Sequence, residues 1–189
     1  HRVKKSELRT NYKILRKKLS SKEIDDLSLQ IANSVLKLPI WKYSFFHVFL
    51  TIKPLKEVLT DPIMSILSGK DKHIVVSKSD FKTRTMSHVL LQDNTLLKPN
   101  SWNIPEPENG ISISDEQIEV VFIPLVTFDK KGNRIGYGKG FYDGFLKNCS
   151  KDTIKIGLSF FDAETVIDDV EPHDIPLDFC VTPNKIYTF

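Results

Sequence analysis

The sequence of 189 residues predicts an α/β fold with an open, mostly parallel sheet and helices on both of its faces. Segments with helical spacing alternate with short apolar segments typical of strands through most of the chain. Apolar residues make up 40% of the chain, which is enough for a substantial core. Because no internal repeat, low-complexity tract or linker interrupts the pattern, we expect one domain over residues 1–189.

Two helices are predicted at the start of the chain. The first covers residues 3–19, and the second opens at a capping box that runs from Ser20 to Glu23 and stops before Pro39. The apolar stripe of the first helix, spaced at i, i+4, i+7 and i+11, consists of Leu8, Tyr12, Leu15 and Leu19. The inward side chains of the second helix are expected to be Ile24, Leu27, Ile31 and Val35.

The first helix is strongly basic. Residues 1–18 hold eight Lys/Arg and one acid, a net charge of +7, so the remainder carries −4 within the overall +3. Such an arm is compatible with nucleic acid, an acidic ligand or a solvated helix. Lys5 and Arg9 lie one turn apart beside the stripe and could reach a site in the body of the protein. Lys13 and Lys17 lie farther round, where snorkelling into solvent is favoured.

The middle of the chain predicts three strands and one helix. The strands are Phe45–Leu50, His73–Ser77 and Met86–Leu91, and the helix begins near Pro62. His47, within the first of these strands, is more typical of a core or edge position than of a catalytic one.

Two loops in this region carry candidate binding residues. Glu57 is the one acid in residues 51–60, at the carboxyl end of a strand, where α/β sheets bind ligands; a helix-flanking charge is the alternative. Trp102, in the Pro-rich loop Ser101–Pro107, could stack on a flat ring or simply pin the loop, and the second interpretation is favoured.

A glycine-rich stretch follows the longest apolar run of the chain. Residues 119–128 predict a buried, parallel strand, and residues 142, 145 and 146 have helical spacing, so the stretch is a strand-to-helix turn. Five of the eight glycines fall there: Gly132, Gly136, Gly138, Gly140 and Gly144.

This turn has the chemistry of a phosphate site. Glycine lets the backbone approach a ligand, and a helix N-terminus offers unpaired N–H groups and partial positive charge. Arg134 and Lys139 add two fixed positive charges, and Asp143 adds a carboxylate of the kind that Mg²⁺ takes beside phosphate oxygens. The alternative is a turn with solvated charges, which is less favoured for five glycines together with these three residues.

Two familiar phosphate loops are excluded. A P-loop requires Ser or Thr after Gly-Lys, and Gly140 follows Lys139 here. A dinucleotide fingerprint requires glycine three residues after Gly140, where Asp143 stands.

The end of the chain contributes a strand and a possible metal ligand. Residues 153–160 predict a strand, and His173 with Asp174 is weak evidence of a site on its own. Cys149 and Cys180 form no C-x-x-C motif and are expected to be reduced, buried thiols. No apolar run approaches the ~20 residues of a membrane span, and no signal segment is visible, so a cytoplasmic location is expected.

The segment from Arg134 to Asp143 resembles the R-[LI]-G-x-G-x-G-[YF]-Y-D signature of the 5-formyltetrahydrofolate cyclo-ligase family, also called methenyltetrahydrofolate synthetases. The preceding strand end, Pro124–Asp129, fits that family's P-x-[VL]-x-[FY]-D. Further matches, spread over nearly the whole chain, are K-x-x-x-R at Lys5 and Arg9, E-x-x-T at Glu57 and Thr60, and W-x-I-x-E-P from Trp102. Residues 171–182 match the family's ending, with H-D-x-x-[LV]-D beginning at His173.

The resemblance implies a three-layer α/β/α domain and an ATP-driven ring closure of 5-formyltetrahydrofolate to 5,10-methenyltetrahydrofolate, with ADP and phosphate released. It implies Mg²⁺ as cofactor, held by Asp143 and Asp174, and Lys139 and Arg134 as catalytic residues. The folate would be bound by Ile52, Glu57, Trp102, Tyr137 and Phe141, with Glu57 on the pterin. ATP would be bound by Lys5, Arg9, Arg134, Ile135, Gly136, Tyr137, Gly138, Lys139, Gly140, Phe141 and Tyr142. The expected partners are these two small molecules, with no nucleic acid and no membrane, and a monomer is expected.

Two positions depart from the family pattern. Phe141 stands where tyrosine is common, and Tyr137 stands where arginine or another polar residue is frequent. We expect Phe141 to pack against the pterin or its aminobenzoate arm, because ATP supplies the driving force and a ring suffices for stacking and excluding water.

Two other functions are weighed against this one. A sugar-phosphate isomerase or a CoA-transferase-like protein also binds phosphate beside glycine turns, but it needs a base in the pocket, for which only Glu57 qualifies. A nucleic-acid-binding module could use the basic first helix, but the net charge of +3 and the lack of interleaved aromatic residues argue against it. Consumption of ATP would separate the cyclo-ligase from the first, and steeply salt-dependent binding would mark the second.

Overall fold

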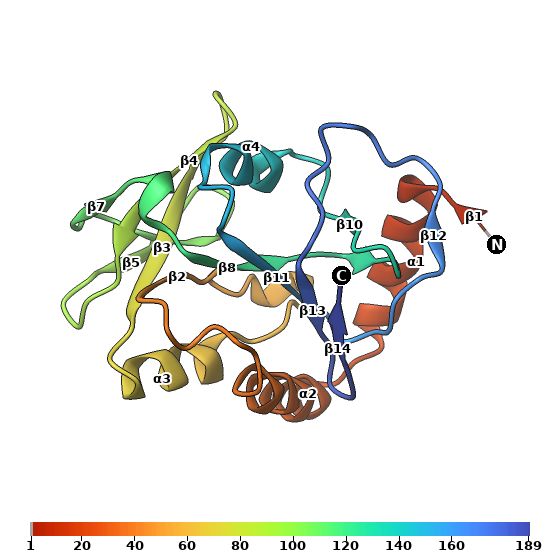
Figure 1. Ribbon diagram of the computed structural model, residues 1–189, viewed down its shortest axis with the longest axis horizontal. Coiled ribbons are helices and arrows are strands. Elements are labelled where there is room, and N and C mark those ends of the chain that lie inside the picture. Colours follow the sequence, from red (N-terminus) through yellow and green to blue (C-terminus); the bar gives the residue numbers. More distant parts are fainter. Residues whose placement is uncertain (1) are drawn as a thin grey trace.

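The central sheet of the computed structural model, which describes residues 2–189, is eight-stranded (Figure 1). The four pairings in its middle are parallel, and the three at its two edges are antiparallel. In spatial order the strands are β14 (Ile186–Thr188), β13 (Phe179–Val181), β11 (Ile154–Leu158), β8 (Val120–Pro124), β2 (Phe45–His47), β3 (His73–Asp80), β4 (Thr85–Leu90) and β7 (Ser112–Ile113).

Helices cover both faces of this sheet, as the sequence predicts. Figure 1 shows α2 (Ser21–Val35) and α3 (Asp61–Gly69) on one side and α4 (Phe141–Asn148) on the other. The predicted three-layer α/β/α arrangement is therefore confirmed. The predicted capping box is also present, with Ser20 and Glu23 bonded reciprocally at the start of α2.

The central strand β8 shows why the sequence there is continuously apolar. Val120 and Phe122 pack in the core on the side of α2 and α3, whereas Val121 and Ile123 pack in the core on the side of α4. All four side chains are fully buried. Successive residues of a strand point to opposite faces, so a strand covered on both faces needs apolar residues at every position.

The first helix, α1 (Lys5–Lys17), packs outside the central sheet through a third apolar cluster. It contributes Leu8 and Tyr12 to this cluster, which also holds Val126, Ile135 and Ile167. The predicted stripe is wrong at Leu15, which is 39% exposed. The physical reason is that the next residue faces the protein instead. Arg16 donates hydrogen bonds to the Leu125 carbonyl and the Tyr137 hydroxyl, and it turns Leu15 outward.

The predicted strand at residues 119–128 divides into two pieces. β8 ends at Pro124, and β9 (Thr127–Phe128) forms a separate hairpin with β10 (Arg134–Ile135), which carries the glycine stretch toward α4. The remaining short elements are β1 (Arg2–Val3), η1 (Lys53–Leu55), β5 (Leu97–Pro99), β6 (Pro105–Pro107), η2 (Asp115–Gln117) and β12 (Val166–Ile167).

Two expectations about composition are also answered. Both cysteines are free thiols, Cys180 buried and Cys149 partly buried. Within residues 2–189, none of the helices combines the length and apolar character that crossing a membrane requires.

Candidate functional site

A cavity of about 560 Å³ opens at the carboxyl ends of the central strands. Phe49 and Leu50, just after β2, and Pro124, at the end of β8, line it, together with Ser77 and Ser79 of β3. This end of a parallel sheet is where open α/β folds bind ligands, and the volume suits a small molecule.

The glycine stretch forms one side of the cavity and leads into α4. Gly138 and Gly140 have φ angles of 87° and 74°, in the left-handed region where L side chains are strained. Gly140 is the N-cap of α4, and it has no side chain to bond the N–H groups of the first turn. These N–H groups therefore remain available to an anion at the cavity.

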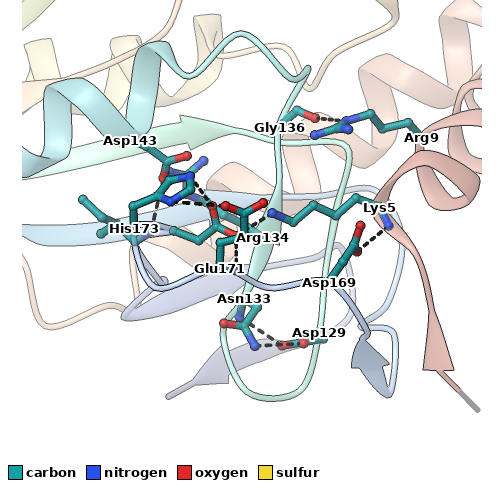
Figure 2. A network of polar contacts seen from close by, with 12 residues as sticks. Lys5, Arg9, Asp129, Asn133, Arg134, Gly136, Asp143, Asp169, Glu171 and His173 are labelled. Carbon is teal, nitrogen blue, oxygen red and sulfur yellow. Dashed lines mark hydrogen bonds and ion pairs between the residues drawn. The ribbon is translucent and has the colours of Figure 1, made fainter.

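Two cations of α1 reach the same place, as predicted (Figure 2). The Lys5 ammonium lies 2.5 Å from Oδ2 of Asp174, and Arg9 Nε donates to the Gly136 carbonyl at 2.9 Å. Lys5 and Asp174 are each only 17% exposed at the side chain. Residues at opposite ends of the chain thus meet beside the glycine stretch.

A second ion pair lies beneath the first. Arg134 Nη2 is 2.5 Å from Oδ1 of Asp143, and the Ile175 N–H donates to the same oxygen at 3.2 Å. Burial lowers the pKa of Arg134, but the charges of Asp143 and Asp174 oppose that shift. The buried Nε of Arg134 has no hydrogen-bond partner within residues 2–189, so one donor of this guanidinium is available to a ligand. We call Lys5, Arg9, Arg134, Asp143 and Asp174 the cationic end of the cavity.

The residues at the cationic end fit the requirements of Mg²⁺. Asp143 and Asp174 both line the cavity, and the negative charge of each acts to raise the pKa of Arg134. Although burial acts in the opposite direction, hydrogen bonds from the Glu171 N–H and from Lys5 lower the pKa of Asp174 and keep it ionised. Residues 2–189 contain no group of three or more His, Cys, Asp or Glu that could enclose a metal. One or two carboxylates completed by substrate oxygens and water is the arrangement that Mg²⁺ commonly adopts.

Glu57 is a buried carboxylate on another side of the cavity. Its side chain is 3% exposed; Oε1 accepts from the Ile52 N–H at 2.7 Å and Oε2 from the Tyr137 hydroxyl at 3.0 Å. Burial raises the pKa of Glu57, and the hydrogen bonds from Ile52 and Tyr137 partly offset the increase. Arg16 donates to the Tyr137 hydroxyl at 2.6 Å and so fixes the ring beside Glu57.

Aromatic rings gather at the mouth of the cavity. Phe141 meets Phe81 edge to face with their ring centroids 5.3 Å apart, and both line the cavity. Phe81 also contacts Trp102 at 5.6 Å, and the Lys139 ammonium lies 5.9 Å from the Trp102 ring. Trp102 itself is 63% exposed.

Most of the sequence-predicted site residues come together in this cavity. Those that line it are Lys5, Arg9, Ile52, Glu57, Arg134, Gly136, Tyr137, Gly138, Lys139, Gly140, Phe141, Tyr142, Asp143 and Asp174. Two lie elsewhere. Ile135 is 1% exposed in the apolar cluster under α1, and its carbonyl is bonded to the Val126 N–H. Trp102 reaches the site only through Phe81 and Lys139.

Sequence reasoning missed several residues of the buried side of the cavity. His47, Ser77, Ser79 and Glu106 all line it, and we call these four the buried wall. Glu106 is 8% exposed and accepts from the Ser79 N–H at 2.6 Å. It belongs to the W-x-I-x-E-P segment, where a carboxylate between two prolines is the sequence signal that could identify it.

Comparisons with known proteins agree on one family. Residues 1–183 match the family described as the 5-formyltetrahydrofolate cyclo-ligase family. The Schizosaccharomyces pombe protein named "Probable 5-formyltetrahydrofolate cyclo-ligase" is 28% identical over 97% of both chains, and the mouse 5-formyltetrahydrofolate cyclo-ligase is 31% identical over 69% of both chains. The solved structure of Aquifex aeolicus 5,10-methenyltetrahydrofolate synthetase superposes with a TM-score of 0.78 at 28% identity, covering 97% of this chain and 92% of that one.

Proposed function

The chain belongs to the 5-formyltetrahydrofolate cyclo-ligase family, and we propose that it closes 5-formyltetrahydrofolate to 5,10-methenyltetrahydrofolate at the expense of ATP, releasing ADP and phosphate. The observation that carries this proposal is the composition of one cavity. It combines a cationic end beside a glycine turn with aromatic rings and a buried carboxylate, which suits a nucleotide phosphate and a flat, polar heterocycle in contact.

The phosphates of ATP would lie at the cationic end. Lys5, Arg9 and Arg134 converge there, and the first turn of α4 adds N–H groups and the positive end of its dipole. Lys139 is exposed in the lining of the cavity and would contact the terminal phosphate of ATP. Phosphoryl transfer needs positioning and neutralisation of charge, which these groups supply.

The folate would lie between Glu57 and the aromatic mouth. Glu57 is an acceptor suited to the N–H groups of an aminopyrimidinone edge, and Phe141 offers a face for the pterin or the aminobenzoate ring. Tyr137 connects the two substrates, because it belongs to the glycine stretch and donates to Glu57.

The chemistry follows from the substrate. The formyl oxygen is a poor leaving group until the γ-phosphoryl of ATP is transferred to it. N10 then attacks the activated carbon, its N–H proton is lost, and phosphate departs with the electron pair of the C–O bond. Arg134 and Lys139 stabilise the charge on the phosphoryl oxygens during both steps. Asp143 and Asp174 would hold Mg²⁺, which supplies further neutralisation of phosphate charge.

The direct test is a spectrophotometric assay of purified protein with 5-formyltetrahydrofolate, with and without Mg-ATP. Methenyl product that forms only with Mg-ATP is the expected result. Absence of product under both conditions would exclude the assignment and return the isomerase and nucleic-acid alternatives to consideration.

A further inference from the structure

A continuous chain of hydrogen bonds leads away from the buried wall of the cavity. His47 Nε2 lies 2.6 Å from the hydroxyl of Ser77, the same hydroxyl lies 2.6 Å from His88 Nδ1, and His88 Nε2 lies 2.6 Å from Oδ1 of Asp115. His47 and Ser77 line the cavity, whereas the Asp115 side chain is 24% exposed on the far side. None of these residues has a role in the proposed phosphoryl transfer.

The register of three neighbouring strands, visible side by side in Figure 1, places these groups together. His47 of β2 pairs with Val75 of β3, two residues before Ser77 and therefore on the same face. Ser77 in turn pairs directly with His88 of β4. Asp115 lies in η2, immediately after β7, which pairs with β4 beside His88.

The position of each proton in this hydrogen-bond chain can be assigned from the Asp115 carboxylate inward. Burial lowers the pKa of His88, despite the hydrogen bond to Asp115, and it lowers the pKa of His47 further below 6.5, so both rings are neutral at pH 7. A carboxylate accepts hydrogen bonds only, so His88 Nε2 carries the proton toward Asp115. His88 Nδ1 is then an acceptor, and Ser77 must donate its hydroxyl proton to it. The Ser77 oxygen can therefore only accept, from His47 Nε2–H.

One atom is left over by this assignment. His47 Nδ1 holds a lone pair, and it is one of four buried side-chain polar atoms within residues 2–189 that have no hydrogen-bond partner. His47 belongs to the cavity lining, and its side chain is 1% exposed, so this nitrogen is buried at the cavity wall. An unpartnered acceptor in a buried position is unfavourable, and a ligand that donates a hydrogen bond to this nitrogen would remove the penalty.

The side chains of α4 around this hydrogen-bond chain are uncharged at neutral pH. From α4, the ring of Phe145 lies 5.0 Å from His47 and 4.4 Å from His88, and the ring of Tyr142 lies 6.1 Å from His47. Burial raises the pKa of Tyr142, and burial together with the charge of Asp115 raises that of Cys149 to about 12. The side of α4 that faces the chain therefore contributes uncharged groups at neutral pH, and Asp115 is the charged group in the chain.

We propose that His47, Ser77, His88 and Asp115 form a proton-accepting chain that takes up the proton lost from N10 of the folate during ring closure. The inference rests on the proposed function. As N10 forms its bond to the formyl carbon, its N–H bond breaks and the proton passes to His47 Nδ1. His47 Nε2–H passes its proton to Ser77, Ser77 passes its hydroxyl proton to His88 Nδ1, and His88 Nε2–H passes its proton to Asp115. When the product has left, the proton moves back along the same hydrogen bonds from Asp115 to His47, and His47 Nδ1–H gives it to water in the open cavity, which restores the starting tautomers.

In this arrangement His47 is the catalytic residue, and the other three act through it. All hydrogen bonds point in one direction, from the cavity to the carboxylate, so one concerted shift moves a proton without leaving a buried charge. Neutral histidines of lowered pKa are poor bases alone. The coupling to Asp115 supplies a negatively charged proton acceptor at a distance from the phosphates.

The decisive variant is Asp115→Asn. The amide oxygen can still accept from His88, so the hydrogen-bond chain is retained, but an amide does not accept the transferred proton. The matched control is Glu116→Gln, which removes the same charge from the next residue of η2, where the side chain is exposed. We expect kcat of Asp115→Asn to fall at least about tenfold, toward the range typical of lost general-base catalysis, with KM for both substrates within about twofold. Glu116→Gln is expected to stay within about twofold of the unmodified protein.

A double-mutant cycle separates a relay from a structural network. Ser77→Ala interrupts the chain between the two histidines, so it is expected to lower kcat by a similar factor and to raise the solvent deuterium isotope effect on kcat. Because the residues act as a unit, Ser77→Ala with Asp115→Asn together should cost little more than either alone. A double variant whose loss equals the product of the single losses, or an Asp115→Asn enzyme as fast as Glu116→Gln, would overturn the relay. If the unmodified protein forms no methenyl product with Mg-ATP, the proposed function itself fails and the relay with it.

Discussion

The cationic end of the cavity and the His47–Ser77 pair of the buried wall hold their polar groups in different ways. At the cationic end the side chains are charged and paired, with Lys5 beside Asp174 and Arg134 beside Asp143, each at 2.5 Å. At the buried wall His47 and Ser77 are neutral, and burial holds the pKa of the histidine well below its usual value. The first arrangement suits binding and neutralising phosphate, and the second suits moving a proton without creating charge.

The two regions should also differ in how they tolerate substitutions. Removing one partner of a buried ion pair leaves an uncompensated charge, which is costly for both stability and binding. Removing one member of a neutral hydrogen-bond chain leaves the charges of the cavity unaltered. The cationic end should therefore be the more sensitive of the two to single substitutions, in substrate binding as well as in turnover.

The largest effect is expected from Lys139→Met. This change removes one donor of positive charge from the transferring phosphoryl group and should lower kcat at least about a hundredfold, with the fold intact by circular dichroism. The control is Lys147→Met, an exposed lysine in the last turn of α4, the helix that follows the glycine stretch. Turnover in Lys139→Met equal to that of the control would remove Lys139 from the catalytic groups.

The next effect concerns Mg²⁺. Asp174→Asn should raise the Mg²⁺ concentration needed for half-maximal turnover by on the order of tenfold or more, because one carboxylate ligand is lost. Glu171→Gln, an exposed neighbour that lacks a place in the cavity lining, should not change it. An unchanged Mg²⁺ requirement in Asp174→Asn would show that the metal is held elsewhere.

The aromatic mouth of the cavity provides a smaller effect. Phe141→Tyr should change kcat/KM by less than about tenfold, or about 1.4 kcal/mol, because the ring is needed mainly for packing. Phe141→Ala should weaken folate binding by more than that and leave ATP binding little changed, which titration calorimetry with each substrate can measure. A hundredfold gain in activity in Phe141→Tyr would mean that a hydroxyl at this position is catalytic, contrary to the proposed assignment.

The smallest effect is on stability and depends on pH. Burial raises the pKa of Glu57 above its unfolded value, so the folded protein holds this proton more tightly than the unfolded chain does. The stability gained from that proton is fully present below the unfolded pKa and is lost as the pH rises through the folded pKa. Glu57→Gln carries no such charge, so its Tm relative to the unmodified protein should rise between pH 5 and pH 8 by a few degrees, since about 1 kcal/mol moves Tm by about 2–4 °C in a domain of this size. A Tm difference that stays constant over that range would show that burial of Glu57 is compensated.

The sequence predicts the cationic end better than the buried wall, for a physical reason. Within ten residues the glycine stretch holds several glycines, an arginine, a lysine and an aspartate. This combination has few structural explanations and directly indicates phosphate binding. Lys5 and Arg9 could be added because helical spacing places them beside an apolar stripe. The prediction failed at Leu15, where hydrogen bonds of Arg16 to Leu125 and Tyr137 override the apolar period.

The buried wall depends on strand register, which local sequence patterns do not specify. His47 was expected in a core or edge position, and its burial agrees with that expectation. Its connection to Asp115 arises only when β2, β3 and β4 align His47, Ser77 and His88 on one face. Ile135 shows that membership of the glycine signature does not by itself place a residue in the site, because its side chain points into the core and away from the cavity.

The ratio of ADP released to methenyl product formed tests most directly whether one cavity joins the reactions of ATP and 5-formyltetrahydrofolate. One ADP should be released for each methenyl product formed, and neither ADP nor the methenyl product should appear when either substrate is omitted. Release of ADP without 5-formyltetrahydrofolate, or formation of the methenyl product without ATP, would contradict this coupling of the two reactions.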